Sequence, residues 1–483
     1  MADSLRDKTV KGTLWSAVDA FLGQGVTFLV GIVLARKLTP EEYGLIGIVL
    51  IFTIILSGVV DSGFPNALIR KKNTTDDDYN TMFITNMTMS IAMFLLLYFV
   101  SPIIAQFFER HELIKLCRVM GLILIIQALS ITQITILTKQ IDFKTKTKAS
   151  LISAVGSGIV GIGMAYAEFG VWALVGQQIS KNLLYTIALW LLVRWWPRLS
   201  FSKESFYYMW GFGWKLTMSG LLNNIWNQLY QVVVGKFYSP ATLGQYSRSK
   251  EYASIFSTNL TAIIQRVSYP ALAEVQDDTE RMLFAYRKII KVSMFITTVS
   301  MIGVAAISEP LIFCLIGPQW AEATSYLPLI CFSMLLYPLH SINLNMLQIQ
   351  GRSDLFLELE IIKKIIAIVP LLLGIFVNIY WMLWGVVVTG FIAFFLNSYY
   401  TGKKLNYSSW KQLKDISSSF LVSSLIAIFV YFFKYLPFSY WIVLPLQLFI
   451  GCILLVVICE KIQLEEYNEL KTISRKALNR IRQ

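Results

Sequence analysis

Apolar runs of roughly 20 residues recur along the whole of this 483-residue chain, and they constrain its fold more than any other feature. That is the length an α-helix needs to cross the hydrocarbon core of a bilayer. The chain is 56% hydrophobic and only 15% charged, and its mean hydropathy is +0.60. The runs between charged or Pro/Gly breaks predict an all-α polytopic membrane protein with about fourteen transmembrane helices.

The lysines and arginines are distributed unequally between alternate connections of the predicted spans. One side collects most of the 42, whereas the other side holds only Arg36, Lys37, Arg110, Lys236 and Lys434. Because basic loops are retained in the cytoplasm, both termini are predicted to be cytoplasmic. The net charge of +13 then reflects loops that lie against anionic membrane lipid, and it gives no reason to expect nucleic acid as a partner.

An internal repeat is visible at an offset of 200 residues. The segment VLARKLTPEEYG, residues 33–44, aligns with VVGKFYSPATLG, residues 233–244, and upstream GTLW at 12–15 corresponds to GFGW at 211–214 at an offset of 199. Two copies with an even number of spans share one orientation, which predicts a pseudo-two-fold axis along the membrane normal with a substrate path between the copies.

The repeat and the span count together predict the domain organisation. It comprises an N-lobe of spans one to six (1–193), a cytoplasmic linker (194–210), a C-lobe of spans seven to twelve (211–402), spans thirteen and fourteen (403–459) and a basic cytoplasmic tail (460–483). The tail is expected to form a helix on the inner membrane surface.

The region from Gly211 to Tyr269 carries more polar chemistry than lipid tolerates on an exposed helix. Helical spacing places Lys215 and two amides, Asn223 and Asn227, on one face of the seventh predicted span. A second polar line in the eighth predicted span contains Arg248, Tyr252, Asn259 and Arg266. Each line is either the wall of a cavity or a set of hydrogen bonds that hold helices together.

Three further charged residues fall within predicted spans of the first half. Asp19 and Asp61 are carboxylates that could take up a proton or a sodium ion, although a salt bridge or an interfacial position explains them equally well. Lys181 lies near the middle of the sixth predicted span. A proton or sodium gradient is therefore the candidate energy source.

The sequence offers no basis for an enzyme. Gly156, Gly158 and Gly161 match a dinucleotide-binding fingerprint only formally, because they lie inside an apolar span without a preceding strand. Ser157, Gly161 and Ala165 instead have the spacing of closely packed membrane helices. No nucleotide-binding loop, metal-ligand cluster or nucleophile constellation is found, so catalytic residues, metal and cofactor are not expected.

The chain resembles a known family of exporters. KGTLWSAVDAF at 11–21, VLARKLTPEEYGLIGI at 33–48, DSGFPNALIRK at 61–71 and GFGWKL at 211–216 are similar to the polysaccharide transporter branch of the MOP exporter superfamily. The resemblance covers essentially the whole chain and is strongest to Wzx-type flippases of the colanic-acid type, which serve lipopolysaccharide, O-antigen or exopolysaccharide synthesis. It implies a V-shaped pair of six-helix lobes with two additional C-terminal helices.

The same resemblance implies a bacterial inner-membrane protein that moves an undecaprenyl-diphosphate-linked oligosaccharide outward by alternating access. Arg248 and Arg266 are then expected to contact the diphosphate, with Lys215 and Lys181 as secondary candidates, because cations satisfy phosphate oxygens well. Asn223, Asn227, Tyr252 and Asn259 are expected to contact sugar hydroxyls. The partners implied are the lipid-linked oligosaccharide, anionic lipid, and the polymerase and glycosyltransferases of the pathway.

Two alternative functions remain open from the sequence. A multidrug and toxin extrusion antiporter of the same superfamily would export organic cations and would favour acidic or aromatic cavity residues, whereas the polar residues found here include several cations. A membrane glycan polymerase would use the same lipid-linked sugars, but such enzymes need a substantial outer loop with catalytic residues. The longest predicted outer connection, Glu309 to Glu322, is short for that purpose.

Overall fold

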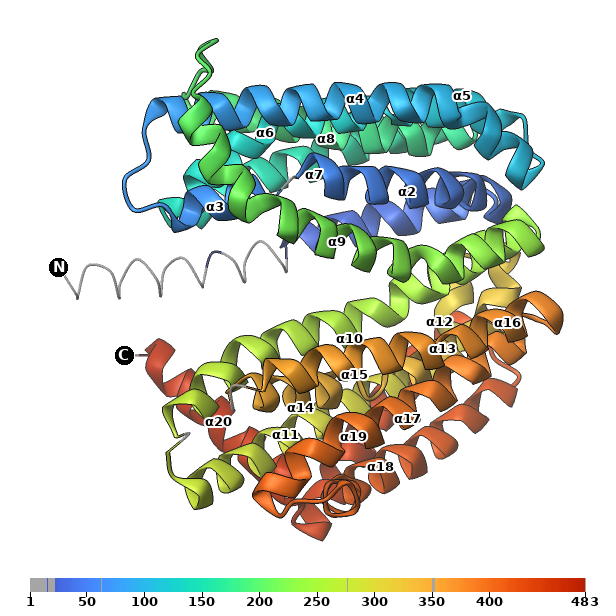
Figure 1. The fold of residues 1–483 in the computed structure, drawn as a ribbon. Helices are drawn as coiled ribbons and strands as arrows, with labels where there is room; N and C mark the ends of the chain where they lie inside the picture. Colours follow the sequence, from blue (N-terminus) through green and yellow to red (C-terminus); the bar gives the residue numbers. More distant parts are fainter. Residues whose placement is uncertain (1–14, 16–21, 62, 276, 350–351, 483) are drawn as a thin grey trace. The chain divides into compact units, whose positions relative to one another are not determined.

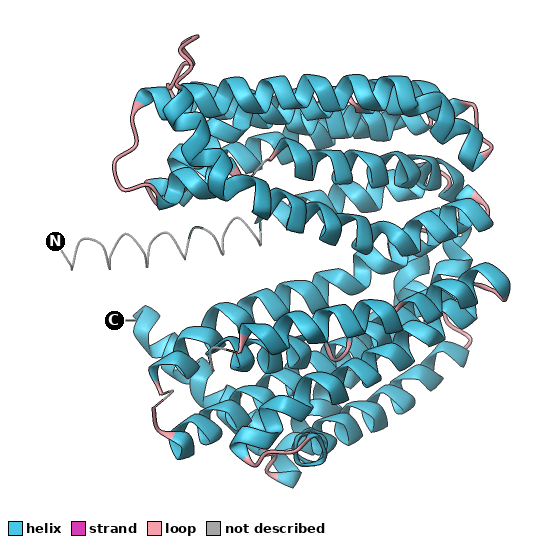
Figure 2. Cartoon of the chain, viewed as in Figure 1, coloured by secondary structure: helices cyan, strands magenta, loops and turns pink. Residues whose placement is uncertain are grey.

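The computed structural model describes residues 15, 22–61, 63–275, 277–349 and 352–482. Within these residues every regular element is a helix (Figure 2). This confirms the all-helical class expected from the sequence. The chain forms two compact units, Met1–Gly244 and Gln245–Gln483, which are described separately below. The division reflects packing of the helices, and the repeat boundary predicted at residues 194–210 stays a prediction.

The first unit contains seven helices of eight residues or more beyond residue 39, all within its described part (Figure 1). They are α2 (Pro40–Val60), α4 (Asp76–Phe108), α5 (Glu112–Met120), α6 (Leu122–Lys139), α7 (Phe143–Tyr166), α8 (Val171–Val193) and α9 (Lys203–Phe237). Residues 22–37 are also helical. The helix α9 starts inside the predicted linker and packs against α2, α3 (Phe64–Arg70) and α4, so it belongs to this unit.

Local sequence signals explain where the helices of the first unit begin. Thr39 and Glu42 form a reciprocal capping box at the start of α2, and Pro40 occupies its first turn. Thr75 and Asp78 form the same motif at the start of α4. Small residues let α7 approach α8, because a Cβ atom on Gly161 would lie 2.9 Å from Cβ of Gln177. This agrees with the close helix packing predicted from the small-residue spacing.

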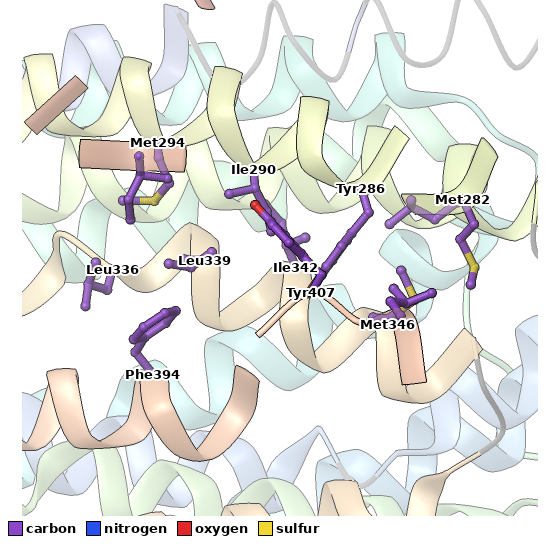
Figure 3. Packing of buried hydrophobic residues seen from close by; sticks show 13 residues of the cluster. Met282, Tyr286, Ile290, Met294, Leu336, Leu339, Ile342, Met346, Phe394 and Tyr407 are labelled. Atoms are coloured by element: carbon purple, nitrogen blue, oxygen red, sulfur yellow. The ribbon is translucent and has the colours of Figure 1, made fainter. Parts of the chain in front are cut away.

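The second unit is built around α11 (Thr279–Ala306), which packs against α13 (Ala321–Met334) and α18 (Ser409–Tyr431). Figure 3 shows its apolar core, in which Tyr286 and Met294 of α11 lie among Leu339, Ile342 and Phe394. The remaining helices are α10 (Pro240–Glu274), whose first residues belong to the first unit, α12 (Ser308–Leu315), α14 (Tyr337–Ile349), α15 (Ser353–Ile366), α16 (Ile368–Phe376), α17 (Ile379–Leu405), α19 (Tyr440–Ile462) and α20 (Glu465–Arg482).

A buried hydrogen-bond network fixes the core of the second unit. The Oδ1 atom of Asn343 accepts hydrogen bonds from Tyr286 Oη at 2.7 Å and from Thr401 Oγ1 at 2.8 Å. Gln412 Nε2 donates to the same oxygen at 3.3 Å. The network joins α11, α14, α17 and α18, and satisfied buried polar groups of this kind specify one arrangement of helices. Helix α18, which corresponds to the thirteenth predicted span, is thereby fixed within this unit.

Nine helices or helix pairs in the described residues are long and apolar enough to cross a membrane. They cover Pro40–Arg70, Asp76–Phe108, Glu112–Lys139, Phe143–Tyr166, Thr279–Ala306, Pro318–Ile349, Ile379–Gly402, Ser409–Tyr435 and Tyr440–Ile462. Helices α8, α9 and α10 coincide with three further predicted spans but contain the polar residues noted above, which lower their hydropathy. The total of fourteen therefore stays a prediction.

Two predicted spans are interrupted near proline residues. The tenth span is divided into α13 and α14 just before Pro338, and the eleventh into α15 and α16 just before Pro370. Proline removes a backbone donor and clashes with the preceding turn, so a break at these points is expected.

The basic C-terminal segment forms a helix, α20, as predicted. Its first half lies against α11, where Lys291 Nζ is 2.6 Å from Glu465 Oε2 and Lys288 Nζ is 2.8 Å from Glu469 Oε2. Glu466 is buried between them. The start of the tail is therefore held by the protein itself through charge pairs.

Candidate functional site: polar residues of the predicted transport path

The polar residues predicted on α9 share one exposed side of that helix. Lys215, Asn223 and Asn227 are exposed, as is Ser219 between them. Met209 and Gly213 are buried, whereas apolar residues on other sides of α9, namely Trp214, Met218 and Ile225, are exposed like the polar line. Helix packing thus leaves this polar line uncovered within its own unit.

A close approach to α2 and α3 holds α9 in this orientation. Gly63, whose φ is +64°, precedes α3, and a Cβ atom there would lie 2.6 Å from the carbonyl oxygen of Gly213. Farther along, a Cβ atom on Gly58 would lie 2.5 Å from Nδ2 of Asn224. Glycine is needed at residue 63 because its backbone conformation and its lack of a side chain are both used. Asn224 is therefore a packing residue, although it lies beside Asn223 in the sequence.

Arg248 and Tyr252, by contrast, are buried in α10. Arg248 Nη1 donates a 2.7 Å hydrogen bond to Oε2 of Glu251, which is half-exposed. The two predicted site residues lie one turn apart on the same side of the helix, as the spacing predicted. Arg248 is therefore already paired with a carboxylate, and the role of both residues in substrate binding stays a prediction.

Other polar residues of α10 hold this helix to α13 and to the turn at Pro318–Trp320 that precedes it. Gln245 donates to the carbonyl of Gln319 at 2.9 Å and accepts from the backbone nitrogen of Ala323 at 3.0 Å. Ser257 Oγ donates to the carbonyl of Met334 at 3.0 Å. The eighth predicted span is thus polar partly because hydrogen bonds fix its packing, which is the structural interpretation left open by the sequence.

The remaining predicted site residues are distributed as follows. Lys181 is half-buried in α8, and Asp61 is exposed at the C-cap of α2. Asp19 and the side chains of Asn259 and Arg266 lie outside the described residues. Lys181 and Asp61 belong to the first unit together with the polar line of α9, whereas Arg248 and Tyr252 belong to the second.

Sequence reasoning missed a hydrogen-bonded chain in the first unit. Ser57 Oγ of α2 donates to Gln127 Oε1 of α6 at 2.9 Å, and Gln127 Nε2 donates to Asn182 Oδ1 of α8 at 3.3 Å. Asn182 is adjacent to Lys181 in the sequence. The signal was the amide Gln127 in a mostly apolar run, but only the contact shows which helices it joins.

A second missed cluster lies where α3, α4 and α6 meet. Both carboxylate oxygens of the fully buried Asp78 accept 2.8 Å hydrogen bonds from Lys71 Nζ. Lys139 Nζ donates to the carbonyl of Leu68 at 3.2 Å and to Thr74 Oγ1 at 3.0 Å. The acidic run at 76–78 beside the basic run at 70–72 was the available signal. These cations stabilise the fold at this end of the unit.

The opposite end of the first unit carries surface ion pairs. Lys236 Nζ lies 2.8 Å from Glu109 Oε1, and Arg110 Nη1 lies 3.5 Å from Glu41 Oε1. The hydrogen bond and charge of Lys236 hold the pKa of Glu109 below its usual value. Both basic residues are among the few predicted on the outer side, so carboxylates neutralise them there.

A shallow pocket of about 710 Å³ lies at the same end. It is lined by Thr39, Glu41, Glu42, Leu45, His111, Glu112, Lys115, Leu116, Glu168, Phe169, Gly170, Val171 and Trp172. Despite this density of carboxylates, the described residues contain no group of three or more His, Cys, Asp or Glu that could hold a metal ion.

Among the curated relatives of this chain are proteins named for the transport or biosynthesis of succinoglycan, teichuronic acid and lipopolysaccharide. The succinoglycan biosynthesis transport protein ExoT of Rhizobium meliloti (strain 1021) is 25% identical over 334 residues, 69% of this chain and 68% of ExoT. The teichuronic acid biosynthesis protein TuaB of Bacillus subtilis (strain 168) is 24% identical over 73% of each chain. The lipopolysaccharide biosynthesis protein WzxC of Escherichia coli (strain K12) is 23% identical over 77% of this chain and 76% of WzxC.

The fold is similar to solved transporter structures. The lipid II flippase MurJ, in an inward closed conformation, aligns with a TM-score of 0.73 over 95% of this chain and 99% of its own, at 16% identity. An inward-facing multidrug resistance MATE family transporter of the MOP superfamily aligns with a TM-score of 0.61 over 82% of this chain and 99% of its own, also at 16% identity. At this level of identity the likeness establishes the fold alone.

The family model described as "Polysaccharide biosynthesis protein" matches residues 33–325. This range includes both copies of the aligned repeat, the polar line of α9 and Arg248. Because the match extends over more than half of the chain, the protein belongs to the Polysaccharide biosynthesis protein family and has the fold of the MOP superfamily transporters.

Proposed function

We propose that this protein translocates undecaprenyl-diphosphate-linked oligosaccharide units across the bacterial inner membrane for lipopolysaccharide or exopolysaccharide synthesis. The family match carries the proposal, because it links the chain to polysaccharide biosynthesis. Relatives named as transport or lipopolysaccharide biosynthesis proteins and the fold shared with a lipid II flippase support it. The protein moves its substrate without covalent chemistry, so it is not an enzyme.

The proposed topology has fourteen spans with both termini in the cytoplasm. The excess of Lys and Arg in alternate connections supports this orientation. Two six-helix lobes, with spans thirteen and fourteen beside them, would open the path alternately to either side of the membrane. The 200-residue repeat supports the pseudo-symmetry that this mechanism requires.

The proposed substrate contacts come from α8, α9 and α10. Lys215, Asn223 and Asn227 are the best supported, because they form one exposed polar line. An amide can both donate to and accept from sugar hydroxyls, while the Lys215 ammonium can donate to diphosphate oxygens. Lys181 would add a second ammonium. Arg266, Tyr252 and Asn259 complete the proposed set, with Arg266 on the diphosphate and the other two on sugars.

Arg248 would bind the diphosphate by exchanging one anionic partner for another. Its 2.7 Å contact with Glu251 pairs the guanidinium with a carboxylate in the absence of substrate. A buried cation is costly unless it is paired, so a carboxylate that can move away provides a means of keeping the site stable when empty. The half-exposed position of Glu251 is compatible with such a movement.

A proton or sodium gradient would drive the cycle, and Asp61 and Asp19 are the proposed coupling residues. Asp61 terminates α2, the helix that supports α9. A change in its charge would therefore act on the element that carries the polar line. The polymerase and glycosyltransferases of the same pathway are the proposed functional partners, and anionic lipid would surround the basic loops.

Multidrug extrusion is the second candidate, because the fold also matches a MATE family transporter. The leaflet distribution of undecaprenyl-diphosphate oligosaccharide in depleted cells separates the candidates. Accumulation in the inner leaflet, reversed by re-expression, is expected for a flippase. Normal translocation with lost drug resistance would assign the protein to multidrug extrusion, and translocated but unpolymerised units would indicate a polymerase.

A further inference from the structure

The first turns of α2 and α10 meet backbone to backbone at two glycines. A Cβ atom on Gly44 would overlap the carbonyl group of Pro240, and a Cβ atom on Gly244 would overlap the carbonyl group of Pro40. All four residues lie in the first unit. We call these four residues, Pro40, Gly44, Pro240 and Gly244, the glycine seam.

The seam is symmetric, because the proline and glycine of α2 occupy the same positions of the internal repeat as those of α10. Pro40 and Gly44 align with Pro240 and Gly244. Both turns start in the same way: Thr39 accepts a hydrogen bond from the backbone nitrogen of Glu42, and Ser239 accepts one from that of Thr242 at 3.1 Å. Proline of one copy faces glycine of the other in both directions, which is the pattern of a local two-fold contact.

Glycine is present at residues 44 and 244 because the two helices approach each other closely, and not because the backbone there adopts a conformation that only glycine allows. Both lie in the helical part of their elements and neither has a positive φ. Alanine is the better helix former at such positions, so an absent side chain has no local advantage. The advantage comes from the opposite helix, whose carbonyl occupies the space that a methyl group would need.

The surroundings of the seam are densely packed. Gly44 and Gly244 are buried, and so is Gly235, the residue aligned with the buried Ala35. A Cβ atom on Gly235 would lie 3.1 Å from Phe108 Cε1 and 3.4 Å from Ile48 Cγ1. The chain next to the seam carries Arg36, Lys37 and Lys236, which belong to the predicted outer side. Nothing as large as a sugar could pass along this contact while it is closed.

We propose that the glycine seam is the outer gate of the transport cycle: it closes the predicted non-cytoplasmic side and must separate when substrate leaves there. The inference rests on the proposed alternating-access function. Because two interlocked turns are either in contact or apart, the seam favours two discrete states, and any side chain at either glycine weakens the closed one.

Accessibility of a cysteine on α9, four residues before the buried Gly235, tests the proposal. The reporter is Gln231→Cys on α9, in a Cys452→Ser background, because Cys452 is exposed whereas the other four cysteines are buried. A membrane-impermeant maleimide is added from outside. Gly44→Ala and Gly244→Ala are each expected to raise the labelling rate about tenfold, the effect of a 1.4 kcal/mol loss of closed-state stability.

Gly163→Ala and Gly303→Ala are matched controls, because a Cβ atom at either glycine would meet nothing within 4 Å. They should leave labelling unchanged. The double variant Gly44→Ala/Gly244→Ala should label at less than the product of the two single effects, since both changes act on one contact. Membrane levels verify insertion, and if one variant fails to insert, the other tests the same contact from the opposite helix.

Unchanged labelling in an inserted seam variant would contradict the proposed gate. So would a double variant whose labelling rate rises by the full product of the two single effects. An incorrect substrate assignment would give a different result. If the protein carries another substrate, labelling would still rise in the seam variants while the leaflet distribution of lipid-linked oligosaccharide would not respond to depletion.

Discussion

Arg248 and Glu251 form a 2.7 Å ion pair within one turn of α10, in which the arginine is buried and the carboxylate is half-exposed. A cation held in this way is paired with a carboxylate in the resting protein, and an anionic substrate would compete with that carboxylate for it. The pair therefore provides a direct test of whether the polar residues of α10 bind substrate or merely hold helices together.

Arg248→Ala should reduce export of the lipid-linked oligosaccharide by about tenfold to a hundredfold, the effect of losing one charged hydrogen bond of about 1.5–3 kcal/mol. Export is measured as outer-leaflet oligosaccharide at equal membrane levels. The matched control is Arg281→Ala, which removes another i,i+3 pair, 3.2 Å from Asp278, but at a fully exposed position. Equal export by the two variants would remove Arg248 from the proposed site.

The exposed polar line of α9 should determine substrate affinity without contributing to stability. Replacing Asn223 and Asn227 together with alanine should lower export by roughly tenfold, because each amide would contribute about 0.5–1.5 kcal/mol of hydrogen bonding. Thermal unfolding in detergent should not change. Leu222→Ala, at a neighbouring exposed position, is the control. Loss of thermal stability in the amide variant would instead indicate a packing role.

Unlike the polar line of α9, the cluster around Asp78 should contribute to the stability of the fold. Asp78→Ala removes a fully buried carboxylate bound to Lys71 and the capping box of α4, and it should lower the free energy of unfolding by about 2–4 kcal/mol. Asp76→Ala, at an exposed position in the same first turn, should lower it by less than about 1 kcal/mol. Denaturant titration of both variants checks this, and equal losses would contradict the structural role of the cluster.

The contact between Glu109 and Lys236 should depend on pH. Since Lys236 lowers the pKa of Glu109 in the folded protein, the contact stabilises the fold above the unfolded value of about 4.3 and loses this effect as the pH falls through the folded value. The small difference in melting temperature between wild type and Glu109→Gln should therefore be present at pH 7 and vanish once the pH has fallen below the lowered pKa of Glu109 in the folded protein. A difference that persists at lower pH would mean that another group is responsible.

Coupling to an ion gradient is tested at the carboxylates. Asp61→Asn and Asp19→Asn each remove a charge while keeping the shape of the side chain. If either residue takes up the driving ion, its variant should transport at a rate that no longer responds to collapse of the proton or sodium gradient by an ionophore. Unchanged gradient dependence in both variants would leave these residues with a structural role only.

The sequence alone determined the class of protein and the positions where its chemistry had to be sought. Apolar runs of membrane-spanning length leave few folds open, since backbone polar groups in lipid must be satisfied within helices. The polar residues 215, 223, 227, 248 and 252 were identifiable because they interrupt such runs, and helical spacing placed the members of each line on a common face. The repeat was recognisable because the turn that starts α2 and the turn that starts α10 have similar sequences.

Tertiary structure decided which of these faces is covered. Spacing shows that Arg248 and Tyr252 share a side of α10, but it does not reveal that this side is buried while the line of Lys215, Asn223 and Asn227 is exposed. Likewise, Gly44 and Gly244 are ordinary helical glycines in the sequence, and only the carbonyls of Pro240 and Pro40 show why a side chain is excluded. Helical periodicity is a property of one segment, whereas burial and close approach depend on the neighbouring helix, which the local sequence does not specify.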